Sequence, residues 1–186
     1  MKFLVHLVLL VAFAALAGAA WVAHRPAAMP APGEPARRQR DVLDELKQAA
    51  IKRSAVFEIS EPELNQYLAR VLQARARPPI ERWTQFRRLA VALQPEVLEA
   101  TLVWDIAGAE RTVSLRFQAA RRDSAFEVQL VGGSYGRLEV PRGLLRPLQP
   151  LLRQLGSVFA EEIGALFQMN QVRVAQGRLV LDPRFP

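Results

Sequence analysis

Hydrophobic and polar residues alternate with a period of two along the middle of the chain. Four such segments follow one another within residues 87–130, and short turns rich in Pro, Gly and Asp separate them. Successive side chains of a strand point to opposite faces, so each segment has one apolar and one polar face. The pattern predicts an antiparallel meander of four strands. Residues 137–140 are expected to form a fifth strand after a glycine-rich bend at residues 132–136.

Helical spacing replaces this alternation on the N-terminal side of the meander. Apolar residues three or four positions apart predict helices over residues 37–53 and 60–77. The second helix opens with a capping box, in which Ser60 is the N-cap and Glu63 is the third helical residue. A short strand-like run at residues 56–59 precedes it.

The C-terminal part is predicted to cover the apolar face of the sheet. Apolar residues recur at three- and four-residue steps over residues 141–169, which predicts a long helix that Pro147 and Pro150 break or kink in its first half. Residues 171–181 are expected to form two closing strands. A one-sided sheet must cover its apolar face. The sequence therefore predicts an α+β fold, with a curved antiparallel meander sheet wrapped on a long C-terminal helix, N-terminal helices and a membrane-spanning N-terminal segment.

The space between this sheet and this helix is the candidate ligand-binding site. Its predicted lining consists of large apolar residues of the strands and of the helix: Leu102, Trp104, Phe117, Phe126, Leu130, Leu151, Leu155, Phe159 and Ile163. The side chains that line a groove for an apolar ligand are the same ones that close an ordinary core. Both interpretations, an open groove and a filled core, follow from the pattern.

The first 24 residues read as a membrane segment. Among residues 3–22, His6 is the only polar residue. A helix of this length spans about 30 Å, the thickness of a hydrocarbon core. Lys2 favours a cytoplasmic N-terminus and an exported body, while Arg25 on the far side of the segment weakens this bias. Two alternatives remain open: a retained anchor in the inner membrane, with the body in the periplasm, or a signal peptide cleaved after the small residues 17–19, which leaves a secreted or periplasmic body.

Residues 25–36 form a Pro- and Ala-rich linker, and residues 37–186 form the exported α+β domain. Such a linker favours extended polyproline-like backbone of about 3.1 Å per residue. We therefore expect it to hold the domain about 30 Å beyond the bilayer.

The amino-acid composition excludes several classes of functional site. The chain has no Cys and only two His, and both His lie within residues 1–24. Disulfide scaffolds, thiolate metal sites and cysteine nucleophiles are therefore excluded. The net charge of +7 comes from arginines spread along the chain, which favours a solvated surface over a nucleic-acid groove, and phosphate-binding glycine motifs are absent from the sequence. We expect no cofactor, no metal and no nucleic-acid partner.

Carboxylates supply the remaining catalytic candidates. Glu99, Asp105 and Glu127 fall on the polar phase of the strands, and Glu110 lies close by. Paired carboxylates of this kind carry out acid–base chemistry in glycosidases, but solvation of the polar face is the simpler interpretation. We therefore assign no catalytic residue and expect the protein not to be an enzyme.

Three motifs resemble those of small bacterial envelope proteins placed near the tubular lipid-binding (TULIP) superfamily. They are Phe57-Glu58-Ile59-Ser60-Glu61-Pro62-Glu63-Leu64-Asn65-Gln66-Tyr67-Leu68, then Gly136-Arg137-Leu138-Glu139-Val140-Pro141, and Gly177-Arg178-Leu179-Val180-Leu181. The resemblance covers residues 55–182. It implies a curved sheet around a long helix, with an apolar groove that takes acyl chains. Relatives that are lipoproteins carry a lipobox cysteine, which this chain lacks.

The sequence thus predicts a non-enzymatic, membrane-anchored envelope protein that binds a lipid or another apolar ligand between sheet and helix. The alternative is an anchored scaffold with a filled core that contacts an envelope enzyme or polymer. In that case an envelope protein partner, rather than a lipid, occupies its surface.

Overall fold

The computed structural model describes residues 2–27, 41–52, 56–75, 84–106, 108–122 and 125–184. It is an α+β structure with antiparallel sheets and an apolar N-terminal helix. Most of the predicted linker, and the ends of the two predicted N-terminal helices at residues 37–40, 53 and 76–77, lie outside the described residues.

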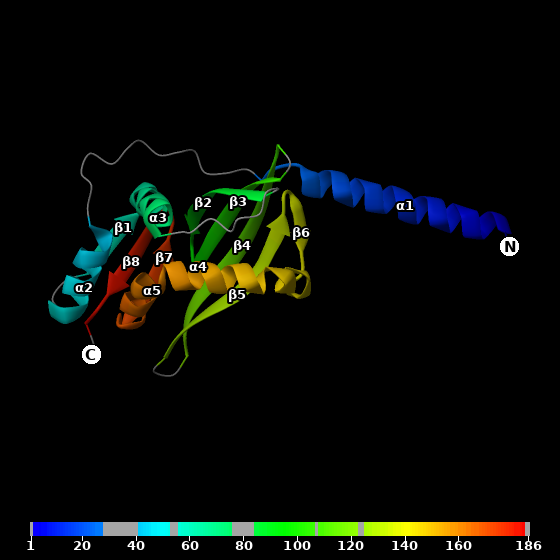
Figure 1. Ribbon diagram of the computed structural model, residues 1–186. Helices are drawn as coiled ribbons and strands as arrows, with labels where there is room; N and C mark the ends of the chain where they lie inside the picture. Colours follow the sequence, from blue (N-terminus) through cyan, green and yellow to red (C-terminus); the bar gives the residue numbers. More distant parts are fainter. Residues whose placement is uncertain are drawn as a thin grey trace.

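Helices and strands follow one another in the order shown in Figure 1. They are α1 (Lys2–His24), α2 (Val42–Lys52), β1 (Phe57–Ser60), α3 (Glu61–Arg75), β2 (Thr84–Gln94), β3 (Val97–Ile106), β4 (Ala109–Arg122), β5 (Ala125–Tyr135), β6 (Leu138–Val140), the 3-10 helix η1 (Arg142–Leu148), α4 (Gln149–Val158), α5 (Ala160–Phe167), β7 (Gln171–Ala175) and β8 (Arg178–Asp182).

The predicted meander is present as a five-stranded sheet in the order β2-β3-β4-β5-β6. All neighbours in this sheet are antiparallel. The glycine-rich bend, however, begins later than the sequence predicted, because β5 continues through Tyr135. A Cβ at Gly133 would lie 2.5 Å from the Ser114 carbonyl oxygen and 3.0 Å from Leu145. Gly133 therefore allows close packing within the sheet, whereas Gly136, with a φ of 55°, makes the turn.

The second sheet joins distant parts of the chain in the order β1-β8-β7. The strands β7 and β8 form the predicted closing hairpin, with Gly177 at a φ of 68° in its turn. The strand β1 pairs with β8 in antiparallel register, with Ile59 opposite Leu179. The short run before α3 thus becomes the third strand of a small C-terminal sheet.

The α3 helix begins as its capping box predicts. The Ser60 amide donates to the Glu63 carboxylate at 3.0 Å, and the Ser60 hydroxyl donates to the same oxygen at 2.7 Å. The Glu63 carboxylate thereby accepts a hydrogen bond from one of the amides that have no backbone partner at a helix N-terminus.

Side chains of α3 close the outer edge of β2. The Asn65 amide donates to the Val91 carbonyl at 2.7 Å and accepts from the Val91 amide at 2.6 Å. The Leu93 amide donates to the Glu61 carboxylate at 2.7 Å, and the Leu93 carbonyl accepts from the Gly177 amide at 2.9 Å. These bonds satisfy the backbone amides and carbonyls of β2 that do not pair with β3. They also connect the large sheet to α3 and to the small sheet.

The long C-terminal helix predicted over residues 141–169 is not present as one helix. It is divided into η1, α4 and α5. Pro147 lies inside η1 and Pro150 lies in the first turn of α4, where a missing amide and a fixed φ interrupt the regular bonding pattern. The second break is at Phe159, which has a φ of −102° and a ψ of 23° and is buried. In Figure 1 α4 lies across one face of the five-stranded sheet.

Two apolar clusters fill the body. The smaller joins the sheet to η1 and α4 and has Leu102, Val113, Leu115 and Leu145 at its centre. The larger joins α2, α3 and α5 to both sheets, and its buried residues include Leu46, Val71, Leu93, Phe159 and Leu181.

The body contacts the end of α1 directly, which corrects the expectation of a separation by about 30 Å. The Arg137 amide donates to the Val22 carbonyl at 3.3 Å, and the Ala27 amide donates to the Thr112 hydroxyl at 2.8 Å. Gly136 packs against the carbonyls of Ala23 and Arg25 so closely that a Cβ has no room. The Val22 carbonyl thus accepts from the sheet as well as from the Arg25 amide, which donates to it at 3.2 Å.

We predict that Asn65→Ala lowers the free energy of unfolding by about 1–3 kcal/mol, because it leaves two buried-edge backbone groups of Val91 without their partner. Urea unfolding of the full chain in detergent micelles, followed by circular dichroism, measures the change. Gln73→Ala, at an exposed position of the same helix, is the control and is expected to change the free energy by less than about 0.5 kcal/mol. Equal effects of the two substitutions would show that the side chain of Asn65 does not hold the edge of β2.

Candidate functional site

One hollow of the body is an apolar cavity of about 450 Å³. It lies between the inner face of the five-stranded sheet, the α4–α5 segment, α2, α3 and the small sheet. Its volume falls in the range of small-molecule sites, about 300–1,000 Å³. Nearly all of its lining residues are aliphatic or aromatic.

The wall formed by the meander follows the alternation seen in the sequence. The lining positions on these strands are spaced two apart: Leu89 and Val91 on β2, Leu98, Ala100 and Leu102 on β3, Leu115, Phe117 and Ala119 on β4, and Val128 on β5. Because successive strand residues point to opposite faces, one face of the sheet supplies this entire wall.

Five of the nine residues predicted from the sequence line the cavity. They are Leu102, Phe117, Leu155, Phe159 and Ile163. Their role as ligand contacts stays a prediction, since the cavity shows only where the side chains lie.

Trp104 and Leu130 do not line the cavity, which corrects their predicted position. Both pack against the smaller cluster, which also contains Leu145 and Leu148 of the η1 segment. Trp104 also meets Phe86 edge to face, with ring centroids 5.9 Å apart. Phe126 and Leu151 lie on described backbone, but their side chains are outside the described residues.

Sequence reasoning missed the walls that come from outside the meander. These lining residues are Val42, Leu43 and Leu46 of α2, Ile59 of β1, Leu64, Tyr67 and Leu68 of α3, and Val172, Val174, Leu179 and Leu181 of β7 and β8. Their apolar spacing indicated buried faces, but it carried no signal for the pairing of β1 with β8 that brings those faces together.

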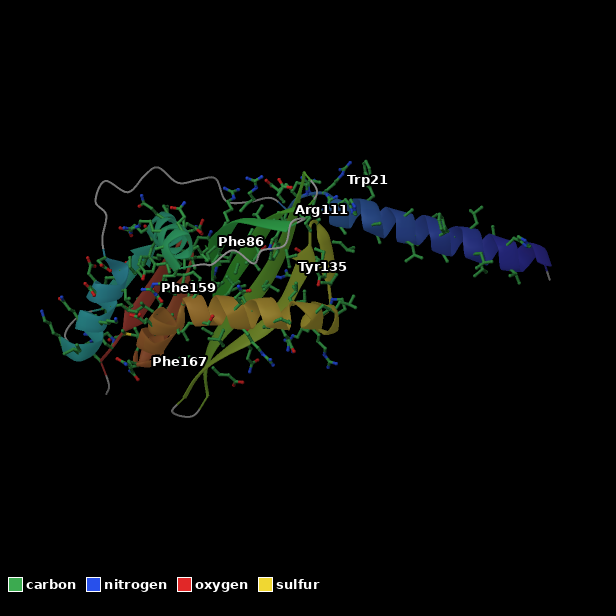
Figure 2. All side chains as sticks on the ribbon, in the orientation of Figure 1. Trp21, Phe86, Arg111, Tyr135, Phe159 and Phe167 are labelled. Atoms are coloured by element: carbon green, nitrogen blue, oxygen red, sulfur yellow. The ribbon has the colours of Figure 1, made fainter. Side chains whose placement is uncertain are left out.

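Two residues of the cavity lining, one on β5 and one on α5, are exposed to solvent. Val128 and Ile163 line the cavity and yet are 50% and 38% exposed, respectively. Figure 2 shows Phe159 and Phe167, at the two ends of α5, on the side of the body opposite to α1.

The polar groups of the wall are bonded to one another. The Tyr67 hydroxyl donates to the Glu162 carboxylate at 2.5 Å, and the Arg75 guanidinium donates to both oxygens of that carboxylate at 3.2 and 3.3 Å. Glu162 and Tyr67 both line the cavity. Burial of the Tyr67 hydroxyl, together with its hydrogen bond to the Glu162 carboxylate, raises the pKa of Tyr67 well above its usual value. Tyr67 therefore stays neutral and serves as a hydrogen-bond donor at ordinary pH.

Of the four carboxylates considered as catalytic candidates, two lie opposite each other and two lie elsewhere on the sheet. Asp105 bonds to Arg87 at 2.8 Å, and this bond holds the pKa of the Asp105 carboxyl below its usual range. Glu110 is opposite Asp105, while Glu99 and Glu127 lie on other parts of the sheet. Within the described residues that line the cavity, none of these four carboxylates occurs.

The acidic pair on α5 has partners across the fold. Glu161 bonds to Lys47 of α2 at 2.9 Å, and Glu162 bonds to Arg75 of α3. Both carboxylates are therefore paired with a cation from another helix, and the Glu161 side chain is at the same time 57% exposed. Across the described ranges, no group of three or more His, Cys, Asp or Glu residues is placed to hold a metal ion.

Among the described residues, one helix is long and apolar enough to cross a membrane. It covers residues 5–24 of α1, and none of it is buried inside the body. Comparison with protein-family models gives no match, and comparison with curated protein sequences gives none either.

We predict that Glu162→Gln lowers the pKa of Tyr67, because it removes the negative charge that disfavours the tyrosinate. The chain contains only two tyrosines, so NMR of ring-labelled tyrosine in the micelle-bound protein separates Tyr67 from Tyr135. Glu161→Gln, one position away and paired with Lys47, is the control and is expected to leave the Tyr67 titration unchanged.

The same contact gives a pH dependence of stability. A folded-state pKa above the unfolded value of about 10 adds stability at neutral pH that is lost as the pH rises above 10. Tyr67→Phe is expected to flatten this alkaline loss in urea unfolding. An equally steep loss in the variant would contradict the assignment.

Proposed function

We propose that this protein is a non-enzymatic, membrane-anchored protein of the cell envelope that binds a lipid acyl chain, or another apolar ligand of similar shape, in the cavity. The observation that carries the proposal is the cavity itself, which holds about 450 Å³ between walls of almost entirely apolar side chains. A ligand that fills this space gains free energy by removing its own apolar surface from water.

The polar part of the wall suits an apolar occupant. The carboxylate of Glu162 has its charge compensated by Arg75 and its hydrogen bonding satisfied by Tyr67. An unpaired charge at this position would penalise an acyl chain, since burying a charge without a partner is costly. The paired arrangement removes that penalty.

The membrane assignment rests on α1. Its length and apolar composition match a bilayer-spanning helix, and Lys2 at its start favours a cytoplasmic N-terminus. We therefore place α1 in the inner membrane as a single pass and the body in the periplasm. A similarity in function to tubular lipid-binding envelope proteins is part of the same proposal.

We predict that Gly156→Leu reduces the bound ligand about tenfold or more, equivalent to about 1.4 kcal/mol of binding free energy. Gly156 lines the cavity from α4, and a Cβ placed there meets no atom within 4 Å, so a larger side chain occupies space that the ligand needs. Native mass spectrometry of the full chain, released from membranes in detergent, measures co-purified lipid in both proteins.

Gly164→Leu on α5 is the matched control. Gly164 is exposed and outside the lining, and a Cβ there also meets no atom within 4 Å. Replacing a helical glycine gains up to about 1 kcal/mol of helix propensity, so both variants are expected to fold at least as well as the parent. Absence of any co-purified lipid in the parent and in the control would overturn ligand binding and favour the scaffold alternative.

A further inference from the structure

Arginines gather where α1 joins the body. The Arg111 guanidinium donates to the His24 carbonyl at 3.2 Å, and the Arg137 guanidinium donates to the Pro26 carbonyl at 3.2 Å. Arg25 follows the last residue of α1. If α1 crosses a bilayer, this group lies at the level where the helix leaves the hydrocarbon core.

An aromatic side chain marks the same level. Trp21 is exposed on the last turn of α1, and the Arg25 guanidinium lies 5.3 Å from the centroid of its ring. Tryptophan is enriched at the boundary between lipid and water. Figure 2 shows Trp21 and Arg111 beside each other at the junction, with Tyr135 nearby on the sheet.

The η1 segment lies at the same end of the body (Figure 1). The Tyr135 hydroxyl donates to the Leu144 carbonyl at 3.1 Å, and Tyr135 directly precedes Gly136, which packs against α1. Leu145 is buried and fixes η1 to the sheet, whereas the neighbouring Leu144 is 58% exposed. A large apolar side chain is therefore presented outward beside the junction.

Cationic side chains flank this leucine. Arg142 and Arg146 are exposed within η1, and the Arg142 guanidinium is positioned by a bond to the Val131 carbonyl at 3.3 Å. An apolar side chain between basic residues is typical of segments that lie in a membrane interface. Of the nearby carboxylates, Glu139 is paired with Arg116 at 3.2 Å.

We propose that this end of the body, the arginine face formed by Arg25, Arg111, Arg137, Arg142 and Arg146, rests on an anionic phospholipid bilayer. Leu144 enters the interfacial region, and the guanidinium groups lie beside lipid phosphates, whose geometry suits their paired N–H donors. The inference rests on the proposed anchoring by α1 but requires neither the cavity nor its ligand.

A depth measurement on the full chain tests the face. The chain has no cysteine, so Leu144→Cys and Phe167→Cys each give one site for an environment-sensitive fluorophore. Phe167 is the matched control because it is 55% exposed, close to the value of Leu144, and lies at the opposite end of the body (Figure 2). In nanodiscs of phosphatidylglycerol and phosphatidylcholine with headgroup-quencher lipids, we expect several-fold stronger quenching at position 144.

Charge reversal tests the electrostatic part. Arg142→Glu combined with Arg146→Glu is expected to reduce the quenching at position 144 to the level of position 167, as are nanodiscs of phosphatidylcholine alone. Arg153→Glu combined with Arg173→Glu, at exposed positions outside the face, is the matched control and is expected to leave the quenching unchanged.

The outcomes separate the face from the anchor. Equal quenching at positions 144 and 167 in a chain that resists carbonate extraction from membranes overturns the face alone, and insensitivity of position 144 to charge reversal does the same. Release of the full chain by carbonate overturns the anchor and the face with it. None of these results changes the expected lipid content of the cavity, which native mass spectrometry measures separately.

Discussion

The structure depends on how the outer edge of β2 is closed. An edge strand of a sheet leaves a row of amides and carbonyls without partners, and here Asn65, Glu61 and Gly177 bond to that row. The same bonds attach α3 and the small sheet to the meander. Because α3 and the small sheet lie at the edge of the large sheet, their apolar side chains form a second wall next to its inner face. The cavity lies between the two walls. Its shape therefore depends on the hydrogen bonds that hold α3 and the small sheet at the edge of β2.

The strands of the meander and their order could be predicted from local pattern. The alternation from Leu89 onward fixes which residues share a face, and short turns leave few ways to connect neighbouring strands. The capping box at Ser60 likewise describes a local interaction between residues three apart. Such features depend on neighbours in the chain, and the sequence displays them directly.

Other features depend on distant residues and could not be predicted from the sequence. The pairing of β1 with β8 joins segments more than a hundred residues apart, and the break of the C-terminal helix at Phe159 places that side chain in the core shared with both sheets. Whether the space beside Phe117 is hollow depends on volumes supplied by α2, β7 and β8. Trp104 is an example: its predicted phase in the strand was correct, but its side chain packs against the cluster that contains Leu145 and does not line the cavity.

The bonds between residues 22–27 and the sheet have a mechanical consequence. A bilayer-spanning helix tilts and turns about its own axis according to the thickness of the lipid around it. If α1 is such a helix, these bonds transmit its motion to the sheet. If α1 spans a bilayer, the exposed part of the cavity lining at Val128 and Ile163 is thus held in a fixed direction relative to the helix.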